Sequence, residues 1–336
     1  MAILNVSLTD NSHQSLQDII THSSVASLLP LACHFTATAL TLTQESKASE
    51  PTELVVLGTL SIAQLQHILQ KCQLTSVALT AINYRNNLHS YRFSVECNDL
   101  TNARNTLATL ALAEKFEAAL LQNAPKLAVP GVLVMDMDST TIKIECIDEI
   151  AELAGVGEQV SAVTELAMQG ELDFAQSLHQ RVATLANAPE SILENVARNI
   201  PLMEGLETLI SALKQHNWRI AIASGGFTYF AEHLQNMLAL DDVRANVLEI
   251  SNGKLTGKVL GNVIDAQAKA DCLNELQQKY HLLPEQTVAM GDGANDLVMM
   301  NAASLGVAFH AKPIVLKQAD CAINQHGLDY LLHWLA

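Results

Sequence analysis

Short apolar runs alternate with helical patterns in the second half of the chain. Three of these runs end in polar residues and precede a turn and a helical pattern: GVLVMD (131–136), WRIAIAS (218–224) and TVAMGD (287–292). Alternation of this kind is typical of a doubly wound, parallel α/β sheet. We therefore expect such a sheet as the core of this part of the chain.

The segment between the first two runs has a helical pattern throughout. It reads as four helices, at 144–154, 157–169, 173–186 and 189–199. A single helix that crosses over between two parallel strands needs far fewer residues. The insert therefore predicts a small helical cap at about 144–200, placed after the first strand of the sheet.

The first half of the chain has a weaker pattern. Residues 1–50 are rich in Ser, Thr and Gln, and the later segments read as strand 53–58, helix 61–72, strands 75–84 and 89–97, and helix 100–121. With a further strand at 31–43, this order predicts a small α/β sandwich. The order resembles a regulatory ligand-binding domain of the ACT type, and a plain structural or dimerising domain fits it equally well.

A linker separates the two halves. The segment QNAPKLAVPG (122–131) contains two prolines and a glycine, which favour a loop. A chain of 336 residues is long enough to form two cores. We therefore expect an N-terminal α/β domain over 1–125, ACT-like or regulatory in type, and a second domain with the helical cap over 126–336.

The chain is acidic, which limits its partners. It has 19 Lys and Arg against 35 Asp and Glu, a formal net charge of −16, and no run of basic residues. Such a surface repels a polyanion, so nucleic acid is excluded as a partner. A small anionic substrate would need local help from a metal ion, a placed cation or a helix N-terminus.

Cysteine usage and hydropathy predict a cytoplasmic protein. The six cysteines are scattered and form no CxxC pair, which argues against a disulfide framework or a zinc knuckle. The N-terminus lacks a basic region followed by an apolar core, and no apolar stretch approaches the length of a membrane span. We expect no membrane contact, and the sequence leaves the oligomeric state open.

The polar residues at the strand ends are the candidates for chemistry, because ligands bind beyond the carboxyl ends of the strands in an open α/β sheet. Asp136 and Asp138 end the first run, and side chains at i and i+2 of an extended segment point to the same side. Such a pair also occurs in metal-binding transferases and among ordinary loop acids. The third run adds Asp292, Asn295 and Asp296. Acids from two strand ends would repel one another unless a cation lay between them, and Mg²⁺ suits carboxylate and carbonyl ligands.

Two further features could bind an anion at the same edge. The second run ends in Ser224-Gly225-Gly226 before a helical pattern, which is typical of an anion site at a helix N-terminus and also of a plain turn. Lys269 opens another helical pattern. A single Lys usually lies on the surface, but a cation at this edge would suit a transferring phosphoryl group.

In order, the set DxDST, SGG, Lys and GDGAND resembles the haloacid dehalogenase superfamily, and within it the phosphoserine phosphatases of the bacterial type with an N-terminal extension. The resemblance runs from about 131 to the C-terminus and includes IECIDEIAELAG, TELAMQGELDFAQSLHQRV and VAFHAKPIVLKQAD. It implies hydrolysis of O-phospho-L-serine to L-serine and phosphate, the last step of serine biosynthesis, through an aspartyl-phosphate intermediate with Mg²⁺.

The resemblance also implies roles for the strand-end residues. Asp136 would be the nucleophile, and Asp138 the general acid and then the general base. The metal would be held by the Asp136 carboxylate, the Asp138 backbone carbonyl and Asp292. The phosphoryl oxygens would be bound by Ser224, the Gly225 N–H and Lys269. Asn295 would touch the substrate, and Asp296 would support Lys269 or a metal-bound water.

Residues of the cap would select the substrate. By the resemblance, Arg181 would bind the α-carboxylate of serine and Glu145 its ammonium group. Phe174 and Met168 would line the pocket. From the residues alone, Phe174 is equally typical of a core aromatic, Met168 of a gap filler, and the two charged residues of a solvated face.

Three other interpretations fit the same motifs. A phosphotransferase would pass the phosphoryl group to another alcohol with the same catalytic residues, and a related phosphatase would act on a small phosphorylated alcohol such as homoserine phosphate. An amino-acid-binding regulatory protein with an inert phosphatase half is the third. Feedback by free L-serine through residues 1–125 is a further expectation.

Overall fold

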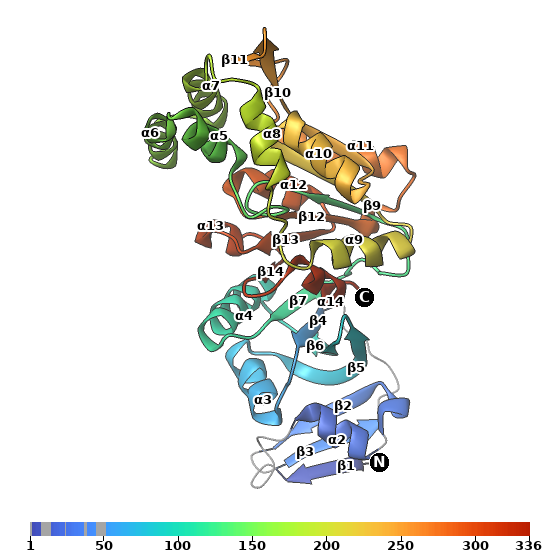
Figure 1. Cartoon of the computed structure of the whole chain (residues 1–336). Helices are drawn as coiled ribbons and strands as arrows, with labels where there is room; N and C mark the ends of the chain where they lie inside the picture. The colour runs from blue at the N-terminus through green and yellow to red at the C-terminus, as the bar shows by residue number, and fades with distance from the viewer. Residues whose placement is uncertain (1, 8–14, 24, 37–38, 45–51) are drawn as a thin grey trace.

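The computed structural model describes residues 2–7, 15–23, 25–36, 39–44 and 52–336. They form two seven-stranded sheets, with the strand orders β1-β3-β2-β5-β6-β4-β7 and β11-β10-β9-β8-β12-β13-β14. The molecule is elongated: the first sheet lies at one end, the second in the middle, and the cap helices at the other end (Figure 1). The C-terminus lies between the two sheets.

The first sheet is antiparallel throughout. Its strands are β1 (Ala2–Ser7), β2 (Leu31–Phe35), β3 (Ala39–Gln44), β4 (Thr52–Leu57), β5 (Thr75–Arg85), β6 (Leu88–Glu96) and β7 (Ala118–Gln122). Its helices are α2 (Leu16–Ser23), η1 (Val25–Leu28), α3 (Ile62–Lys71) and α4 (Leu100–Glu114).

Two predicted elements of this half are wrong in extent. The single strand expected at 31–43 is a hairpin, in which β2 pairs with β3. The helix expected at 100–121 ends at Glu114, because Lys115 takes a left-handed conformation with φ 58° and caps it. The following apolar residues form the edge strand β7, which pairs with β4.

The second sheet is parallel from β10 to β14, and β11 alone among its strands runs antiparallel. The predicted parallel α/β sheet is thus confirmed. Its strands are β8 (Val132–Met135), β9 (Arg219–Phe227), β10 (Asp242–Ser251), β11 (Lys254–Leu260), β12 (Thr287–Gly291), β13 (Leu305–Phe309) and β14 (Cys321–Ile323). The helices outside the cap are α9 (Leu206–Gln215), α10 (Thr228–Leu238), α11 (Ala266–Lys279), η2 (Pro284–Gln286), η3 (Ala294–Asp296), α12 (Leu297–Ala302), α13 (Pro313–Leu316), η4 (Leu328–Tyr330) and α14 (Leu331–Trp334).

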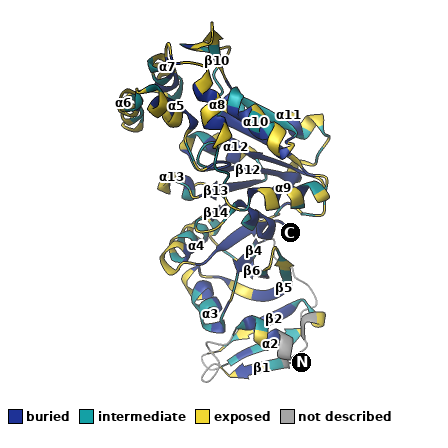
Figure 2. Ribbon diagram, viewed as in Figure 1, coloured by how far each residue is buried: buried dark blue, intermediate teal, exposed yellow. Residues whose placement is uncertain are grey.

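The central strand β8 is completely buried, as Figure 2 shows for this sheet. Leu133 and Met135 belong to the larger apolar cluster on one face, and Val132 and Val134 to a smaller cluster on the other. Helices cover both faces of a parallel sheet, so its strands are continuous apolar runs rather than alternating ones. Because β8 is packed on both faces, the residue that follows it, Asp136, is held in a defined position.

The cap consists of α5 (Cys146–Ala154), α6 (Gly157–Met168), α7 (Phe174–Thr184) and α8 (Ser191–Arg198), each within a range expected from the sequence. Its two connections to the sheet pair with one another. Lys143 N–H donates to Pro201 O at 3.0 Å, and Met203 N–H donates to Thr141 O at 3.0 Å. We call these paired segments, 141–143 and 201–203, the hinge ribbon. At its far end, the cap also bonds to β11 through Asn187 and Ala188.

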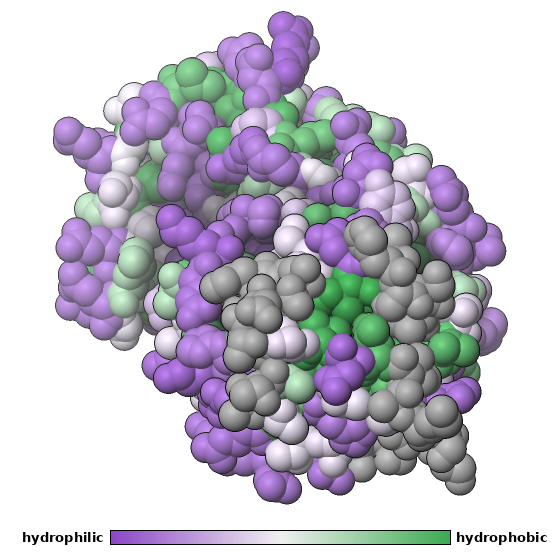
Figure 3. All heavy atoms as spheres, turned by 90° about the horizontal axis from the view of Figure 1, so that it is seen from below, coloured by the Kyte–Doolittle hydropathy of each residue, from purple (hydrophilic) through white to green (hydrophobic). Residues whose placement is uncertain are grey.

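The surface at the N-terminal end is predominantly hydrophilic. Seen from below, it shows a compact apolar area beside the atoms drawn in grey and further apolar atoms scattered among the hydrophilic ones (Figure 3). Within the part of the chain that the structure describes, no helix combines the length and the apolar character needed to cross a membrane.

Candidate active site

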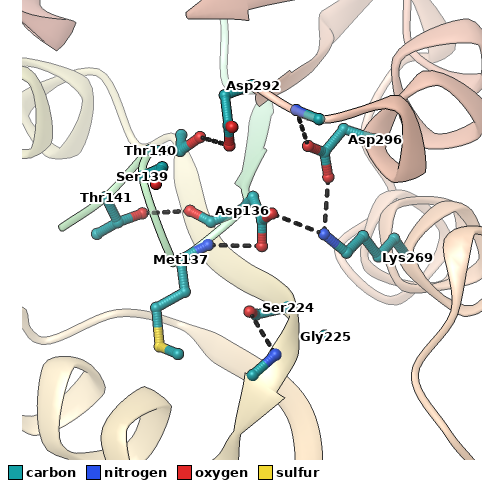
Figure 4. Close-up of polar contacts among 12 residues, drawn as sticks. Asp136, Met137, Ser139, Thr140, Thr141, Ser224, Gly225, Lys269, Asp292 and Asp296 are labelled. Carbon is teal, nitrogen blue, oxygen red and sulfur yellow. Dashed lines mark hydrogen bonds and ion pairs between the residues drawn. The ribbon is translucent and has the colours of Figure 1, made fainter. Parts of the chain in front are cut away.

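The candidate residues meet because β9, β8 and β12 are neighbours in the sheet. Asp136 follows β8, Ser224 lies near the carboxyl end of β9, and Asp292 follows β12. The Asp136 N–H donates to Met290 O at 2.9 Å, which continues the pairing of β8 with β12. The carboxyl ends of these strands therefore bring the three side chains to one edge (Figure 4).

Lys269 comes to this edge from the first turn of α11. Asp265 begins that helix by accepting a hydrogen bond from Ala268 N–H at 2.9 Å, so Lys269 lies one turn in. Its ammonium group is fully buried and pairs with Asp136 Oδ2 at 2.9 Å and with Asp296 Oδ1 at 2.7 Å. Burial opposes the charged form, but the two carboxylates together raise the pKa of Lys269 above its ordinary value. The site therefore holds a permanent cation beside Asp136.

Asp296 is shared between this cation and the backbone. Its Oδ2 accepts from Gly293 N–H at 2.9 Å while Oδ1 holds Lys269. Burial, and then the nearby Asp136, raise the pKa of Asp296. A Cβ at residue 291 would collide with the Asp296 side chain, which explains the glycine at the end of β12.

Three carboxylates form a cluster with the composition of a metal site. Asp136, Asp292 and Asp296 each offer an oxygen, and these oxygens lie within 4.8 Å of one another. Thr140 donates its hydroxyl to Asp292 Oδ1 at 3.2 Å. Burial, and then repulsion by Asp136, raise the pKa of Asp292. Because the donors are all oxygens, the cluster fits a hard divalent cation.

Asp138 lies at the boundary between the sheet and the cap. Its Oδ1 accepts from Cys146 N–H, the first residue of α5, at 3.2 Å. Burial raises the pKa of Asp138 to about 8, with smaller contributions from Glu145 and Asp136. A carboxyl group that keeps its proton near neutral pH can donate it to a leaving alcohol.

The Ser-Gly-Gly segment at the end of β9 presents the Ser224 hydroxyl toward the same space. Ser224 is buried, and its Oγ accepts from Gly226 N–H at 2.9 Å. A side chain at Gly225 would meet the ring of Phe174, so the cap packs directly over this end of β9. The buried Asn246 donates to Gly225 O at 2.8 Å and accepts from Ile264 N–H at 2.9 Å.

A cavity of about 340 Å³ lies between the strand ends and the cap. The candidate substrate-binding residues that line it are Glu145, Met168, Phe174, Arg181, Ser224, Gly225 and Asn295. Lys269 reaches the site from behind Asp136 and is not part of this lining. The cavity thus extends from the strand-end residues to the charged residues of the cap.

The cap contributes one cation and two acids to the cavity. Within the residues that the structure describes, the buried Nε of Arg181 has no hydrogen-bond partner. Burial lowers the pKa of Arg181, while Asp148 and Glu145 act in the opposite direction. Ser139 donates its hydroxyl to Glu145 Oε1 at 2.9 Å. A ligand carboxylate would give this nitrogen an acceptor.

Several lining residues were missed by the sequence reasoning. Asp148, Thr164 and Lys312 line the cavity beside the expected residues. Asp148 is three residues from Glu145 on the start of α5, so helical spacing could have indicated it. Lys312 lies three residues after β13, in a segment that the resemblance covers, but the sequence reasoning gave it no role.

The comparisons with known proteins agree with this geometry. The family model of haloacid dehalogenase-like hydrolases matches residues 131–304. The chain belongs to this family. The resemblance drawn from the four motifs is therefore confirmed for the haloacid dehalogenase-like hydrolases.

Similar haloacid dehalogenase-like hydrolases include curated phosphoserine phosphatases. That of Vibrio cholerae is 53% identical over 238 residues, which is 71% of this chain and 72% of the relative. That of Haemophilus influenzae is 57% identical over 218 residues, 65% of this chain and 69% of the relative. The crystal structure of a probable phosphoserine phosphatase from Vibrio cholerae, unliganded, has a TM-score of 0.73 at 46% identity, and covers 87% of this chain and 88% of its own. A substrate-bound phosphoserine phosphatase complex has a TM-score of 0.59 at 39% identity, over 62% of this chain and 99% of its own.

Proposed function

We propose that this chain is a phosphoserine phosphatase, which hydrolyses O-phospho-L-serine to L-serine and phosphate. One observation carries the proposal. A single cavity joins Asp136 and Ser224, beside the buried cation of Lys269, to Arg181 and Glu145 of the cap. The first group suits a phosphoryl group, and the second, in which Arg181 Nε has no partner among the described residues, suits the two charges of an amino acid. Relatives with this name at 53% and 57% identity support it.

In the first step, a carboxylate oxygen of Asp136 attacks phosphorus, and the bond between phosphorus and the serine oxygen breaks. Asp138 gives its proton to the departing serine oxygen. In the second step, Asp138 takes a proton from water, whose oxygen attacks phosphorus and breaks the bond to Asp136. Phosphate leaves, and both carboxyl groups return to their starting states.

The charge on the phosphoryl oxygens is balanced by groups held in place beforehand. Lys269 supplies a buried cation, and the Ser224 hydroxyl and Gly225 N–H supply hydrogen bonds. Asp296 keeps Lys269 in position, and Asn295 lies in the lining where it can touch the substrate. Donors that need not move during the reaction stabilise the transition state more than mobile ones do.

The metal in this proposal is Mg²⁺, held by the Asp136 carboxylate, the Asp138 backbone carbonyl and Asp292. Asp296 also belongs to the carboxylate cluster, but its Oδ1 is already engaged by Lys269. When bound, Mg²⁺ would offset the repulsion between the carboxylates and the phosphoryl oxygens.

The cap residues read the serine part of the substrate. Arg181 binds the α-carboxylate, since a guanidinium offers two parallel donors, and Glu145 binds the ammonium group. Phe174 and Met168 line the remaining cavity. A cavity of about 340 Å³ is at the small end of the range for ligand sites, which suits an amino-acid phosphate.

Three broader expectations stay predictions: a domain boundary at 125/126, feedback by L-serine, and a cytoplasmic location. The six cysteines, all within the described residues, are free thiols, which supports a reducing compartment.

Phosphate release from a panel of phosphorylated amino acids and alcohols tests the function directly. We expect O-phospho-L-serine to be the best substrate with Mg²⁺, and activity to vanish with EDTA and return when Mg²⁺ is added back. Homoserine in the assay detects transfer to another alcohol, and free L-serine detects feedback. A chain that releases phosphate faster from homoserine phosphate, or from none of these compounds, would overturn the proposal.

A further inference from the structure

The C-terminal segment is held between α9 and the first sheet. Its helix α14 contacts α9 on one side and β4 and β5 on the other. Arg92, on β6, is buried and donates to the carbonyl oxygens of His333, Trp334 and Leu335 at 3.0, 2.9 and 2.5 Å. Arg85, on β5, donates to Leu335 O at 2.7 Å. Cations at the carbonyl end of a helix are favourable. The two arginines therefore bind the end of the chain to the first sheet.

The turn between β5 and β6 adds a further contact with the C-terminal segment. Asn86 and Asn87 have φ values of 46° and 61°, as required in a two-residue hairpin turn whose residues are commonly Asn or Gly. From this turn, the Asn86 side-chain amide donates to Asp329 Oδ2. Asp329 lies in η4, directly before α14.

Asp329 in turn rests on the start of α9. Its Oδ1 lies only 2.0 Å from the position that a Cβ at Gly205 would take, and Gly205 has a positive φ of 76°. Leu328 N–H donates to Glu204 O at 2.8 Å. These residues therefore hold Glu204 and Gly205, which directly follow the hinge ribbon.

The hinge ribbon connects this contact to the active site. The Glu204 carboxylate pairs with Lys143 of the opposite segment. Met203 N–H donates to Thr141 O at 3.0 Å, and the Thr141 hydroxyl donates to the Asp136 carbonyl at 2.5 Å. An unbroken set of contacts thus runs from the first sheet to the backbone of Asp136 and to both connections of the cap.

We infer that Asn86 and Asp329 are positioning residues for the cap: through them, the first sheet fixes the hinge ribbon and so sets where Arg181 and Glu145 meet the substrate. The inference rests on the proposed function. Asp136 is also held to β12 by its N–H bond to Met290 O, and Ser224 and Lys269 are placed by the second sheet and α11. A displaced hinge therefore disturbs recognition of the serine part more than the phosphoryl site. A displacement of about 1 Å in a bound substrate is enough to cost activity.

The test uses the full chain and two substrates. Asn86→Gly keeps the positive φ of the turn but removes the amide, and Asn87→Gly is the matched control, since its side chain faces Tyr84 instead. We expect Asn86→Gly to lower kcat/KM for phosphoserine about 3- to 10-fold, the range for changes along a coupled network, with little change for p-nitrophenyl phosphate. Asn87→Gly should have the wild-type kcat/KM for both substrates.

A double-variant cycle identifies the contact. Asp329→Ala should lower phosphoserine turnover in the same selective way, and the pair Asn86→Gly with Asp329→Ala should be no worse than Asp329→Ala alone. Asp329→Asn, which keeps an oxygen for Asn86, should restore most of the activity. If the two residues had a purely structural role, their replacement would lower kcat/KM for both substrates together.

Equal losses on the two substrates, independent effects in the double variant, or wild-type behaviour of Asn86→Gly would overturn the inference. Failure of the wild-type chain to hydrolyse phosphoserine would instead overturn the proposed function, because that outcome does not depend on either variant.

Discussion

In the proposed function, Arg181 is the side chain on which substrate choice depends most. It lies in the cavity with its Nε buried and without a partner among the described residues, while Glu145 and Asp148 favour its charged form. Leaving such a group unpaired is costly, and a ligand that pairs with it recovers that cost. The arrangement favours a substrate with a carboxylate over one without.

Replacing Arg181 with alanine should therefore separate two substrates. We expect kcat/KM for phosphoserine to fall about 100-fold, because hydrogen bonds between charged groups are lost, and that for an aryl phosphate to change about twofold or less. Arg181→Lys serves as the control, since it keeps the charge without the fork and should recover part of the loss. Steady-state kinetics with both substrates measure this, and equal losses would show that Arg181 does not read the carboxylate.

The strand-end residues could be found from the sequence because parallel strands bring their carboxyl ends together. Asp136, Ser224 and Asp292 each end an apolar run, and three adjacent strands place them at one edge. Asn246 and Asp329 could not be found in this way. Their partners are 18 to 243 residues away, and only the folded chain shows the pairing.

The helix α14 carries a buried histidine at the contact between the two sheets. His333 is 1% exposed, and its Nδ1 bonds to the Ser90 hydroxyl at 2.9 Å. Burial, and then the nearby Arg85, lower the pKa of His333 to about 4, with Arg92 and His89 adding to the effect. The helix is therefore stable against the first sheet while this ring is neutral.

Acid should weaken this contact. The unfolded chain binds a proton at His333 near pH 6.5, whereas the folded chain does so near pH 4, so the free energy of unfolding falls as the pH drops through that window. The full effect is about 3 kcal/mol, of which about 2 kcal/mol is lost by pH 5. Urea unfolding at pH 7.5, 6 and 5 measures it, and His333→Gln is the control. An unchanged pH dependence in His333→Gln would show that another group is responsible.

Element boundaries were predicted well where one periodicity dominates and poorly where two fit. The four cap helices have a clear helical pattern, and all four lie within the expected ranges. The segment AALLQ at 118–122 fits the end of a helix as well as a strand. Its pairing with β4 decides the matter, and a sequence pattern does not contain that long-range contact.

One apolar cluster spans both sheets. Val55 and Leu57 of β4, and Ala119 and Leu121 of β7, belong to the same buried cluster as Leu133 of the second sheet. The polar contacts around this core differ in burial: Arg92 is buried and pairs with Glu53 at 2.6 Å, whereas Arg104 pairs with Asp320 at 2.7 Å near the surface. The linker pattern at 122–131 did not indicate that the halves are joined so closely.

Replacing Arg92 should therefore destabilise the whole chain. Arg92→Ala leaves several buried carbonyl groups and Glu53 without their cation, and should lower the free energy of unfolding by about 3 kcal/mol. Arg104→Ala, which breaks a partly exposed pair between the sheets, should cost about 1 kcal/mol or less. Calorimetry of both variants measures this, and we expect the wild type to unfold in one transition. A similar, small loss of unfolding free energy in both variants would contradict a shared core. Two transitions in the wild type would also contradict it.

The central claim is that Asp136 takes the phosphoryl group from phosphoserine, and rapid acid quenching with radiolabelled phosphoserine tests it most directly. During turnover we expect label on the peptide that contains Asp136, and none in Asp136→Asn, which lacks the nucleophile. Label on another residue, or turnover by Asp136→Asn at the wild-type rate, would contradict the account.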